Sequence, residues 1–314
     1  MATPLVFLFP GQTSRDAEML DRLERISPRH ADQVRGVLRA NGAPADSNLA
    51  VQLSVLAMSL AYLGIANECG LRAIASAGMS LGEYAHLVHI GALTPEAAID
   101  LILERGRLYD AGPEGAMVAL QPVASDEVER LVQRVSSDLD LGAGELAVSN
   151  INSPSQCVVA GRRDAVAALG ALAEDELCAI PKVIESRIPM HCARFLPVAH
   201  AFRPHLEAAP WCAPKLRYRP NVTGEALASP NAPAFVELLT QHVHRRVLWQ
   251  STVDGLLRDH PGAVLVEVGP RRALSAVFGR RWHPGVRCLP LDLMDDASPE
   301  AFAAHITEIH DATH

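Results

Sequence analysis

The sequence has little of what marks three broad classes of protein. Basic residues are not in excess: 36 Asp and Glu outnumber 28 Lys and Arg, and the net charge of −8 argues against a general nucleic-acid binder. No apolar run approaches the roughly 20 residues that a membrane span needs. Internal repeats and low-complexity segments are also absent. We therefore expect a globular protein that partners neither nucleic acid nor a membrane.

Cysteine pairing motifs are missing too. The six cysteines form no CxxC pair and no zinc spacing, so we expect reduced, mostly buried thiols in a cytoplasmic protein. The chain start lacks a basic region, and the apolar run at 5–9 is too short for a signal peptide. His242 and His244 have no evident third ligand, so we expect no metal site.

What the sequence does contain is an alternation of apolar strands and helices. Continuous apolar runs at 5–9, 74–77 and 263–268 are typical of strands buried on both faces, and helical patterns separate them. We predict a large α/β-hydrolase-like domain with a parallel sheet over 1–115 and 187–314. Between these parts the predicted order is strand, helix, strand, strand, helix, strand, which indicates an inserted small ferredoxin-like α+β domain over 116–186.

The pentapeptide Gly78-Met79-Ser80-Leu81-Gly82 lies between a predicted strand and a predicted helix. This is the context of a nucleophile elbow, in which the serine hydroxyl is exposed on a sharp turn. Backbone amides at the start of the helix favour negative charge, such as the oxyanion formed when a serine attacks a carbonyl. An ordinary glycine-rich turn is the alternative. The flanking pattern favours Ser80 as a nucleophile.

Arg105 lies on the apolar stripe of the helix that starts at Thr94-Pro95, beside Leu101 and Ile102. A buried arginine needs an anion, because an unpaired charge away from water is very costly. One explanation is a salt bridge to Glu83 or another buried acid. The other is a substrate carboxylate held by two parallel hydrogen bonds. The helix alone does not decide between them.

A general base for Ser80 must come from thirteen histidines. His86 and His89 lie on the helix after Ser80 and are expected to point away from it. His191 precedes a predicted helix, in Pro189-Met190-His191, but position alone does not select it.

Seven segments in order along the whole chain resemble the malonyl-CoA:acyl-carrier-protein transacylase family, which includes the acyltransferase domains of polyketide synthases. They are Phe9-Pro10-Gly11-Gln12, Gly78-Met79-Ser80-Leu81-Gly82-Glu83-Tyr84, Glu104-Arg105-Gly106, Asn152-Ser153-Pro154-Ser155-Gln156, Pro189-Met190-His191, Asn221-Val222-Thr223-Gly224 and Glu267-Val268-Gly269-Pro270.

The resemblance implies a ping-pong transfer of an acyl group from a CoA thioester to the phosphopantetheine thiol of an acyl carrier protein, with no permanently bound cofactor. Ser80 and His191 would form the catalytic dyad. It also implies further roles, which are oxyanion binding by the amides of Gln12 and Leu81, orientation of the imidazole by the carbonyl of His242, carboxylate binding by Arg105, and pocket lining by Asn152 and Gln156.

Three positions depart from the family pattern. Met79 replaces a histidine before the nucleophile, Thr13 replaces a glycine in the oxyanion loop, and Met190 fills the position that tunes acyl size. These changes suggest a specialised member, and they leave a second function open: a hydrolase, or a transferase between carrier proteins, with a non-malonyl acyl group. A non-catalytic protein that only docks carrier proteins is a third alternative.

A carrier protein is typically acidic, so docking on this acidic chain needs a local basic patch. The candidates are the pairs Arg245-Arg246, Arg271-Arg272 and Arg280-Arg281. Solvated surface arginines are the alternative for each pair.

Overall fold

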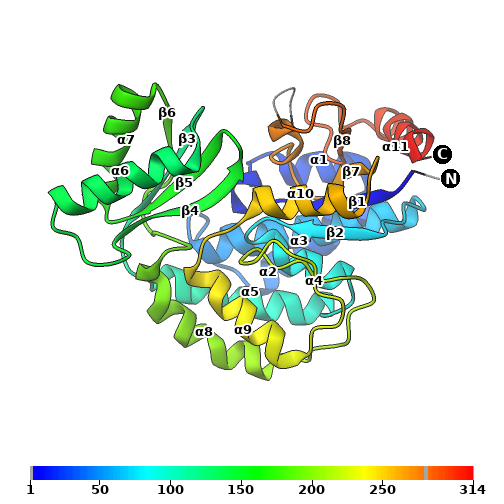
Figure 1. The fold of residues 1–314 in the computed structure, drawn as a ribbon. Coiled ribbons are helices and arrows are strands. Elements are labelled where there is room, and N and C mark those ends of the chain that lie inside the picture. The colour runs from blue at the N-terminus through cyan, green and yellow to red at the C-terminus, as the bar shows by residue number, and fades with distance from the viewer. Residues whose placement is uncertain (1–2, 279–281, 314) are drawn as a thin grey trace.

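The computed structural model describes residues 3–278 and 282–313. Its central element is β1 (Leu5–Phe9), which is buried along its whole length. This strand pairs in parallel with β2 (Ala75–Gly78) on one side and with β7 (Val264–Glu267) on the other, and β8 (Cys288–Pro290) extends the sheet beyond β7 (Figure 1). The predicted parallel sheet is confirmed, and its carboxyl ends gather the loops after β1, β2 and β7 at one edge.

Helices cover this sheet and build the rest of the larger part of the molecule. They are α1 (Met19–Ile26), α2 (Pro28–Ala40), α3 (Asn48–Glu68), α4 (Gly82–His89), α5 (Pro95–Asp110), α8 (Leu196–Ala208), α9 (Ala232–His244), α10 (Trp249–Asp259) and α11 (Pro299–Thr313). The start of α5 is as expected, because the Thr94 hydroxyl accepts a hydrogen bond from Ala97 N and Pro95 occupies the first turn.

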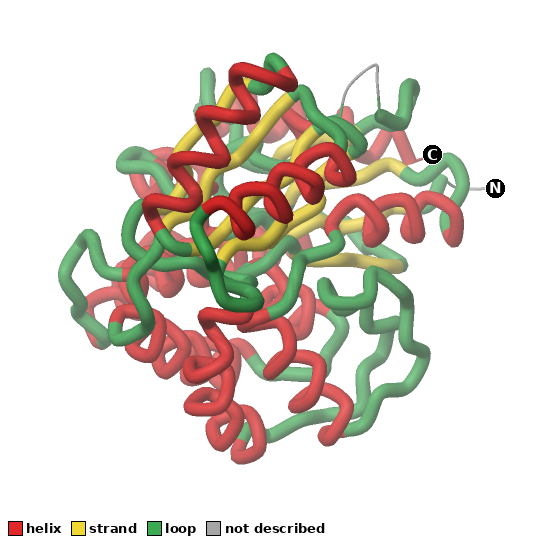
Figure 2. The backbone as a smooth tube through the Cα atoms, turned by 60° about the vertical axis from the view of Figure 1, so that its left-hand side comes forward, coloured by secondary structure: helices red, strands yellow, loops and turns green. Residues whose placement is uncertain are grey.

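A second sheet lies apart from the first and is antiparallel. It contains β3 (Ala116–Gln121), β4 (Leu146–Ser153), β5 (Gln156–Gly161) and β6 (Ile180–Glu185), in the order β4-β5-β3-β6. Helices α6 (Ser125–Asp138) and α7 (Arg163–Leu177) complete the ferredoxin-like order, and Figures 1 and 2 show them packed beside this sheet. The fold class is therefore confirmed. The domain limits at 115/116 and 186/187 stay predictions.

The two sheets are joined through the segment that leads into α10. Val247 N donates to Ser149 O on β4, and Ile151 N donates to Val247 O. This short ladder fixes the smaller sheet against the larger part of the molecule. At the opposite side the two chain ends meet, since Thr3 N donates to Thr313 O (Figure 1).

Two expectations need correction. Helix α3 is long and apolar enough to cross a membrane by length and composition, although we expected no such stretch. In the structure 78% of its most apolar window is buried against other elements, which is typical of a core helix. The six cysteines are free as expected, but only Cys157 and Cys192 are buried, while Cys178 and Cys212 are exposed. The first error is an underestimate of the apolar length of residues 48–68, and the second arises because burial depends on which elements pack together.

Candidate active site

The nucleophile elbow is formed by the turn between β2 and α4. Ser80 lies at its tip with a φ of 51°, in the left-handed region that non-glycine residues rarely adopt. A Cβ atom on Gly78 would lie 1.9 Å from Gly82 O, and one on Gly82 would lie 2.1 Å from Phe9 O. Glycine is therefore required on both sides of Ser80, because strand, turn and helix approach too closely for any side chain.

Asn221 holds this turn from a distant part of the chain. Its Oδ1 accepts a hydrogen bond of 2.7 Å from Ser80 N, and its Nδ2 donates one of 2.6 Å to Gly78 O. Asn221 is fully buried, so these bonds are shielded from water. The sequence analysis quoted Asn221 within a matched segment but gave it no role, because nothing in the sequence places it beside Ser80.

His191 lies directly opposite the nucleophile. Its Nε2 is 2.7 Å from Ser80 Oγ, and its Nδ1 is 2.7 Å from the carbonyl oxygen of His242. A carbonyl accepts only, so Nδ1 carries the proton and Nε2 is left to accept the hydroxyl proton of Ser80. His191 also has a positive φ, 59°, and its backbone N donates to Val243 O over 3.2 Å. The structure thus brings Ser80, His191 and the His242 carbonyl together.

The His191 imidazole is neutral at physiological pH. Burial and, to a lesser extent, the positive charge of Arg105 lower its pKa to about 3, against the opposing effect of the bond to the His242 carbonyl. A neutral ring is the form that can accept a proton from a serine hydroxyl.

Two backbone amides near Ser80 are available to an anion. Gln12 is the first residue of the short 3-10 helix η1 (Gln12–Ser14), which follows β1, and Leu81 immediately precedes α4. Neither amide donates a backbone or side-chain hydrogen bond within 3–278 and 282–313. Unpaired amides at helix starts carry partial positive charge, which suits them to bind an oxyanion.

Arg105 is completely buried in α5. Its guanidinium lies 4.1 Å from the centre of the Tyr109 ring and 5.7 Å from that of Tyr84, and Nη1 donates to Gln52 Oε1 over 2.5 Å. Nε and Nη2 have no hydrogen-bond partner among the residues that the structure describes. These two nitrogens form the edge of the guanidinium that binds a carboxylate in two parallel bonds.

A salt bridge from Arg105 to a buried acid is not observed among the described residues. Glu83, the acid we considered, instead accepts hydrogen bonds from Tyr218 Oη and from Asn221 N. Burial raises the pKa of Glu83 to about 8, which makes it mostly neutral at pH 7. The charge of Arg105 therefore has no resident counter-ion within hydrogen-bonding distance.

A cavity of about 510 Å³ opens above Ser80 and His191. Met79, Met190 and Gln12 line it from the larger part of the molecule, and Asn152 and Gln156 line it from the second sheet, where Asn152 Nδ2 donates to Gln156 Oε1. Leu81, Arg105 and His242 do not line it. The side chain of Leu81 is not needed there, since only its amide was expected to act.

The other histidines in the described part of the chain do not line this cavity. His86 and His89 both bond through Nδ1 to the buried hydroxyl of Ser76, at 2.7 Å and 2.8 Å. Within the described part of the chain no group of three potential ligands could hold a metal ion, and this includes the surroundings of His242 and His244.

Comparisons with known proteins point to one family. The family model described as "Acyl transferase domain" matches residues 6–285. A malonyl CoA-acyl carrier protein transacylase of Haemophilus influenzae is 29% identical over 291 residues, which cover 87% of this chain and 90% of that protein. The FabD crystal structure from Acinetobacter baumannii has a TM-score of 0.84 at 29% identity, covering 98% of this chain and all of that one. A malonyl-transacylase solved in complex with a type II polyketide synthase acyl-carrier protein has a TM-score of 0.86 at 25% identity, covering 98% of this chain and 100% of that one.

Proposed function

Because the chain belongs to the acyl transferase domain family, we propose that it moves a malonyl or related carboxyacyl group from a CoA thioester to the phosphopantetheine thiol of an acyl carrier protein. The observation that carries the proposal is the 2.7 Å contact between Ser80 Oγ and His191 Nε2 at the floor of the cavity. The partner follows from relatives whose names and structures include an acyl carrier protein.

In the first half-reaction, His191 Nε2 takes the hydroxyl proton while Ser80 Oγ attacks the thioester carbon. The new bond places negative charge on the former carbonyl oxygen, where the amides of Gln12 and Leu81 stabilise it. The intermediate then breaks its carbon–sulfur bond. His191 returns the proton to the departing CoA sulfur, and the acyl group remains on Ser80 as an ester.

In the second half-reaction the carrier thiol enters the same cavity. His191 accepts its proton, the sulfur attacks the acyl-serine, and the proton returns to Ser80 Oγ as the ester bond breaks. The carbonyl of His242 holds the imidazole in one orientation throughout. The first half-reaction passes the Ser80 hydroxyl proton to CoA, and the second restores it from the carrier thiol, so the protons balance over the full cycle without a bound cofactor. CoA leaves before the carrier thiol enters, which makes the cycle ping-pong.

We propose that Arg105 binds a carboxylate on the transferred group. Its Nε and Nη2 are buried without partners, and a malonyl carboxylate would supply two acceptors and a balancing charge. We propose that Asn152 and Gln156 contact the substrate from the opposite wall. We also propose the domain limits given above and a cytoplasmic location.

One observation favours a second candidate. Arg105 does not line the cavity, whereas Met79 and Met190, which precede Ser80 and His191 in the sequence, line it and add apolar surface. Methionine side chains adapt to apolar groups of different shapes. A hydrolase or a transferase between carrier proteins that uses a non-malonyl acyl group would fit this floor. A non-catalytic docking protein would not need the contact between Ser80 and His191, so the geometry does not favour that alternative.

Mass spectrometry of intact protein after incubation with a panel of acyl-CoA esters tests these proposals. Malonyl transfer predicts a malonyl adduct on Ser80 that disappears when carrier protein is added. A different acyl adduct, or free acid formed without a carrier, would instead support the second candidate. Ser80→Ala is the control and should carry no adduct. A wild-type chain that gains no adduct from any donor would contradict both enzymatic candidates.

A further inference from the structure

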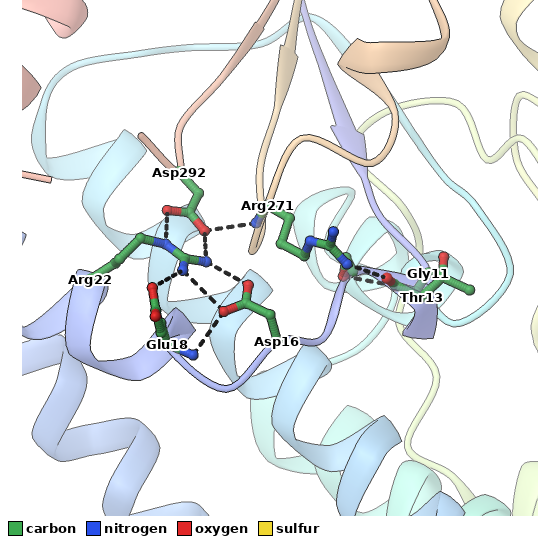
Figure 3. Close-up of polar contacts among 8 residues, drawn as sticks. Gly11, Thr13, Asp16, Glu18, Arg22, Arg271 and Asp292 are labelled. Atoms are coloured by element: carbon green, nitrogen blue, oxygen red, sulfur yellow. Dashed lines mark hydrogen bonds and ion pairs between the residues drawn. The ribbon is translucent and has the colours of Figure 1, made fainter. Parts of the chain in front are cut away.

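Three loops meet at one side of the cavity, and a chain of polar contacts ties them together. They follow the neighbouring parallel strands β1, β7 and β8, so their carboxyl ends lie side by side. Asp292, in the loop after β8, is fully buried and accepts a 2.7 Å hydrogen bond from the backbone N of Arg271, in the loop after β7. Figure 3 shows this contact beside the loop after β1.

The anchor of this chain is a buried arginine. Arg22, on α1, is only 2% exposed and donates to Asp292 through Nε at 2.8 Å and Nη2 at 2.7 Å. The same guanidinium binds both carboxylate oxygens of Asp16, at 3.0 Å and 2.6 Å. Bidentate hydrogen bonds between buried, oppositely charged groups restrict the positions of both partners. Arg22 therefore fixes Asp292 in the loop after β8 and Asp16 in the segment after β1 (Figure 3).

Arg271 extends this support to the turn that presents Gln12. Its Nη1 donates to Thr13 O over 3.3 Å, and it lines the cavity. Within the turn, Gly11 O accepts from Ser14, and Gln12 O accepts from Arg15 N. Among the described residues Arg271 is therefore the one donor that reaches a carbonyl of this turn from another loop.

The backbone of Arg271 is also unusual. Its φ is 65°, in the left-handed region that favours glycine. Strain of this kind persists only where the surroundings enforce it, and it is concentrated at functional sites. Here the bond to Asp292 enforces it and aims the side chain at Thr13.

We propose that Arg271 is a positioning residue for acyl transfer: it braces the 3-10 turn so that the Gln12 amide points at the developing oxyanion. This inference rests on the proposed function, since it assigns a support to the oxyanion-binding amide. The competing explanation is that this exposed cation at the cavity binds a phosphate of CoA.

The test compares Arg271→Lys, Arg271→Met and Arg271→Gly with the wild type in single-turnover acylation of Ser80. Lysine retains a donor, methionine retains length without a donor, and glycine also removes the backbone strain. Each variant is tested with malonyl-CoA and with malonyl-N-acetylcysteamine, a thioester without phosphates. Asp140→Gly is the matched control, because Asp140 is an exposed residue with a φ of 48° outside the cavity lining.

We expect the saturating acylation rate of Arg271→Met and Arg271→Gly to fall about tenfold with both donors, since a displaced oxyanion donor slows the chemical step. The half-saturating donor concentration should not change, Arg271→Lys should recover most of the rate, and Asp140→Gly should match the wild type. Unchanged rates would overturn the inference. So would a loss confined to malonyl-CoA, which identifies phosphate binding. Failure of the wild type to form an adduct with malonyl-CoA would refute the proposed malonyl transfer instead.

Discussion

Ser80 Oγ lies 2.7 Å from His191 Nε2, and both residues have a left-handed backbone, with φ of 51° and 59°. A non-glycine residue in this region costs of order 1–3 kcal/mol. Separate contacts enforce each conformation, through Asn221 at Ser80 and through the Val243 carbonyl at His191. Two of the six described non-glycine residues with a positive φ therefore form the contact on which the proposed chemistry depends.

We expect Ser80→Gly to be more stable than Ser80→Ala by about 1 kcal/mol. Glycine adopts a positive φ without a steric penalty, whereas alanine retains that penalty. Both variants lack the hydroxyl, so the difference isolates the backbone term. Urea unfolding monitored by circular dichroism gives the two free energies, and neither variant should form an acyl adduct. Equal free energies would show that the turn holds Ser80 without strain.

Replacing Arg105 separates the two candidate functions. Arg105→Met keeps most of the buried volume but removes the unpaired Nε and Nη2. Hydrogen bonds to a charged group contribute about 1.5–3 kcal/mol, so acylation by malonyl-CoA should fall by roughly 10-fold or more relative to acetyl-CoA. The ratio of the two single-turnover rates is the measurement. An equal loss with both donors would assign Arg105 a structural role.

The sequence predicted those features that depend on local pattern. Apolar runs placed β1 and β7, the glycine spacing placed the elbow, and the stripe position of Arg105 predicted a buried cation that requires an anion. Each of these follows from residues close together in the chain. The three-residue strand β8 was missed because a strand that short has no readable period, and the helix α11 was not predicted either.

Contacts between distant residues were beyond the same analysis. Asn221 and Ser80 are 141 positions apart, and Arg22 and Asp292 are 270 apart. Their pairing depends on the path of the whole chain, which no local pattern encodes. Residue position did not select His191 among thirteen histidines either; the family resemblance did. Resemblance gave no role to Asn221 or Arg271, which became visible only with the fold.

The acylation rate should change little between pH 8 and pH 6. Burial lowers the pKa of His191 to about 3, so the base stays unprotonated, whereas an ordinary imidazole with a pKa near 6.5 would lose about three-quarters of its activity over this range. Arg105 also lowers this pKa, so Arg105→Met should shift any acid limb upward. Single-turnover acylation across the range is the measurement, and a limb centred near 6.5 in the wild type would contradict the expectation.

The stability of the fold, unlike the acylation rate, should depend on pH because of Glu83. Burial raises the pKa of Glu83 to about 8, and Glu83 Oε2 lies 3.6 Å from Nε2 of His242, whose carbonyl orients His191. Because this folded-state pKa lies above the ordinary value of 4.5, Glu83 supports stability below about pH 4.5 and loses that support as pH rises through 8. Glu83→Gln should therefore flatten the fall in stability between pH 4.5 and about 8, measured by thermal unfolding across that range, and an unchanged slope would contradict this assignment.

Arg245 is the candidate that separates carrier docking from catalysis. It is exposed and makes no ion pair within the described residues, whereas Arg246 is bound to Glu129 and to Val148 O. Arg271 and Arg272 line the cavity, and Arg280-Arg281 lie outside the described residues.

If an acidic carrier docks on Arg245, Arg245→Glu should raise the KM for carrier protein about threefold to tenfold and leave acylation by CoA thioester unchanged. Arg25→Glu, on α1, is the matched control, because Arg25 is also exposed and makes no ion pair among the described residues, and it should leave that KM unchanged. A KM that Arg245→Glu does not alter, or that both reversals raise equally, would remove Arg245 from the docking surface.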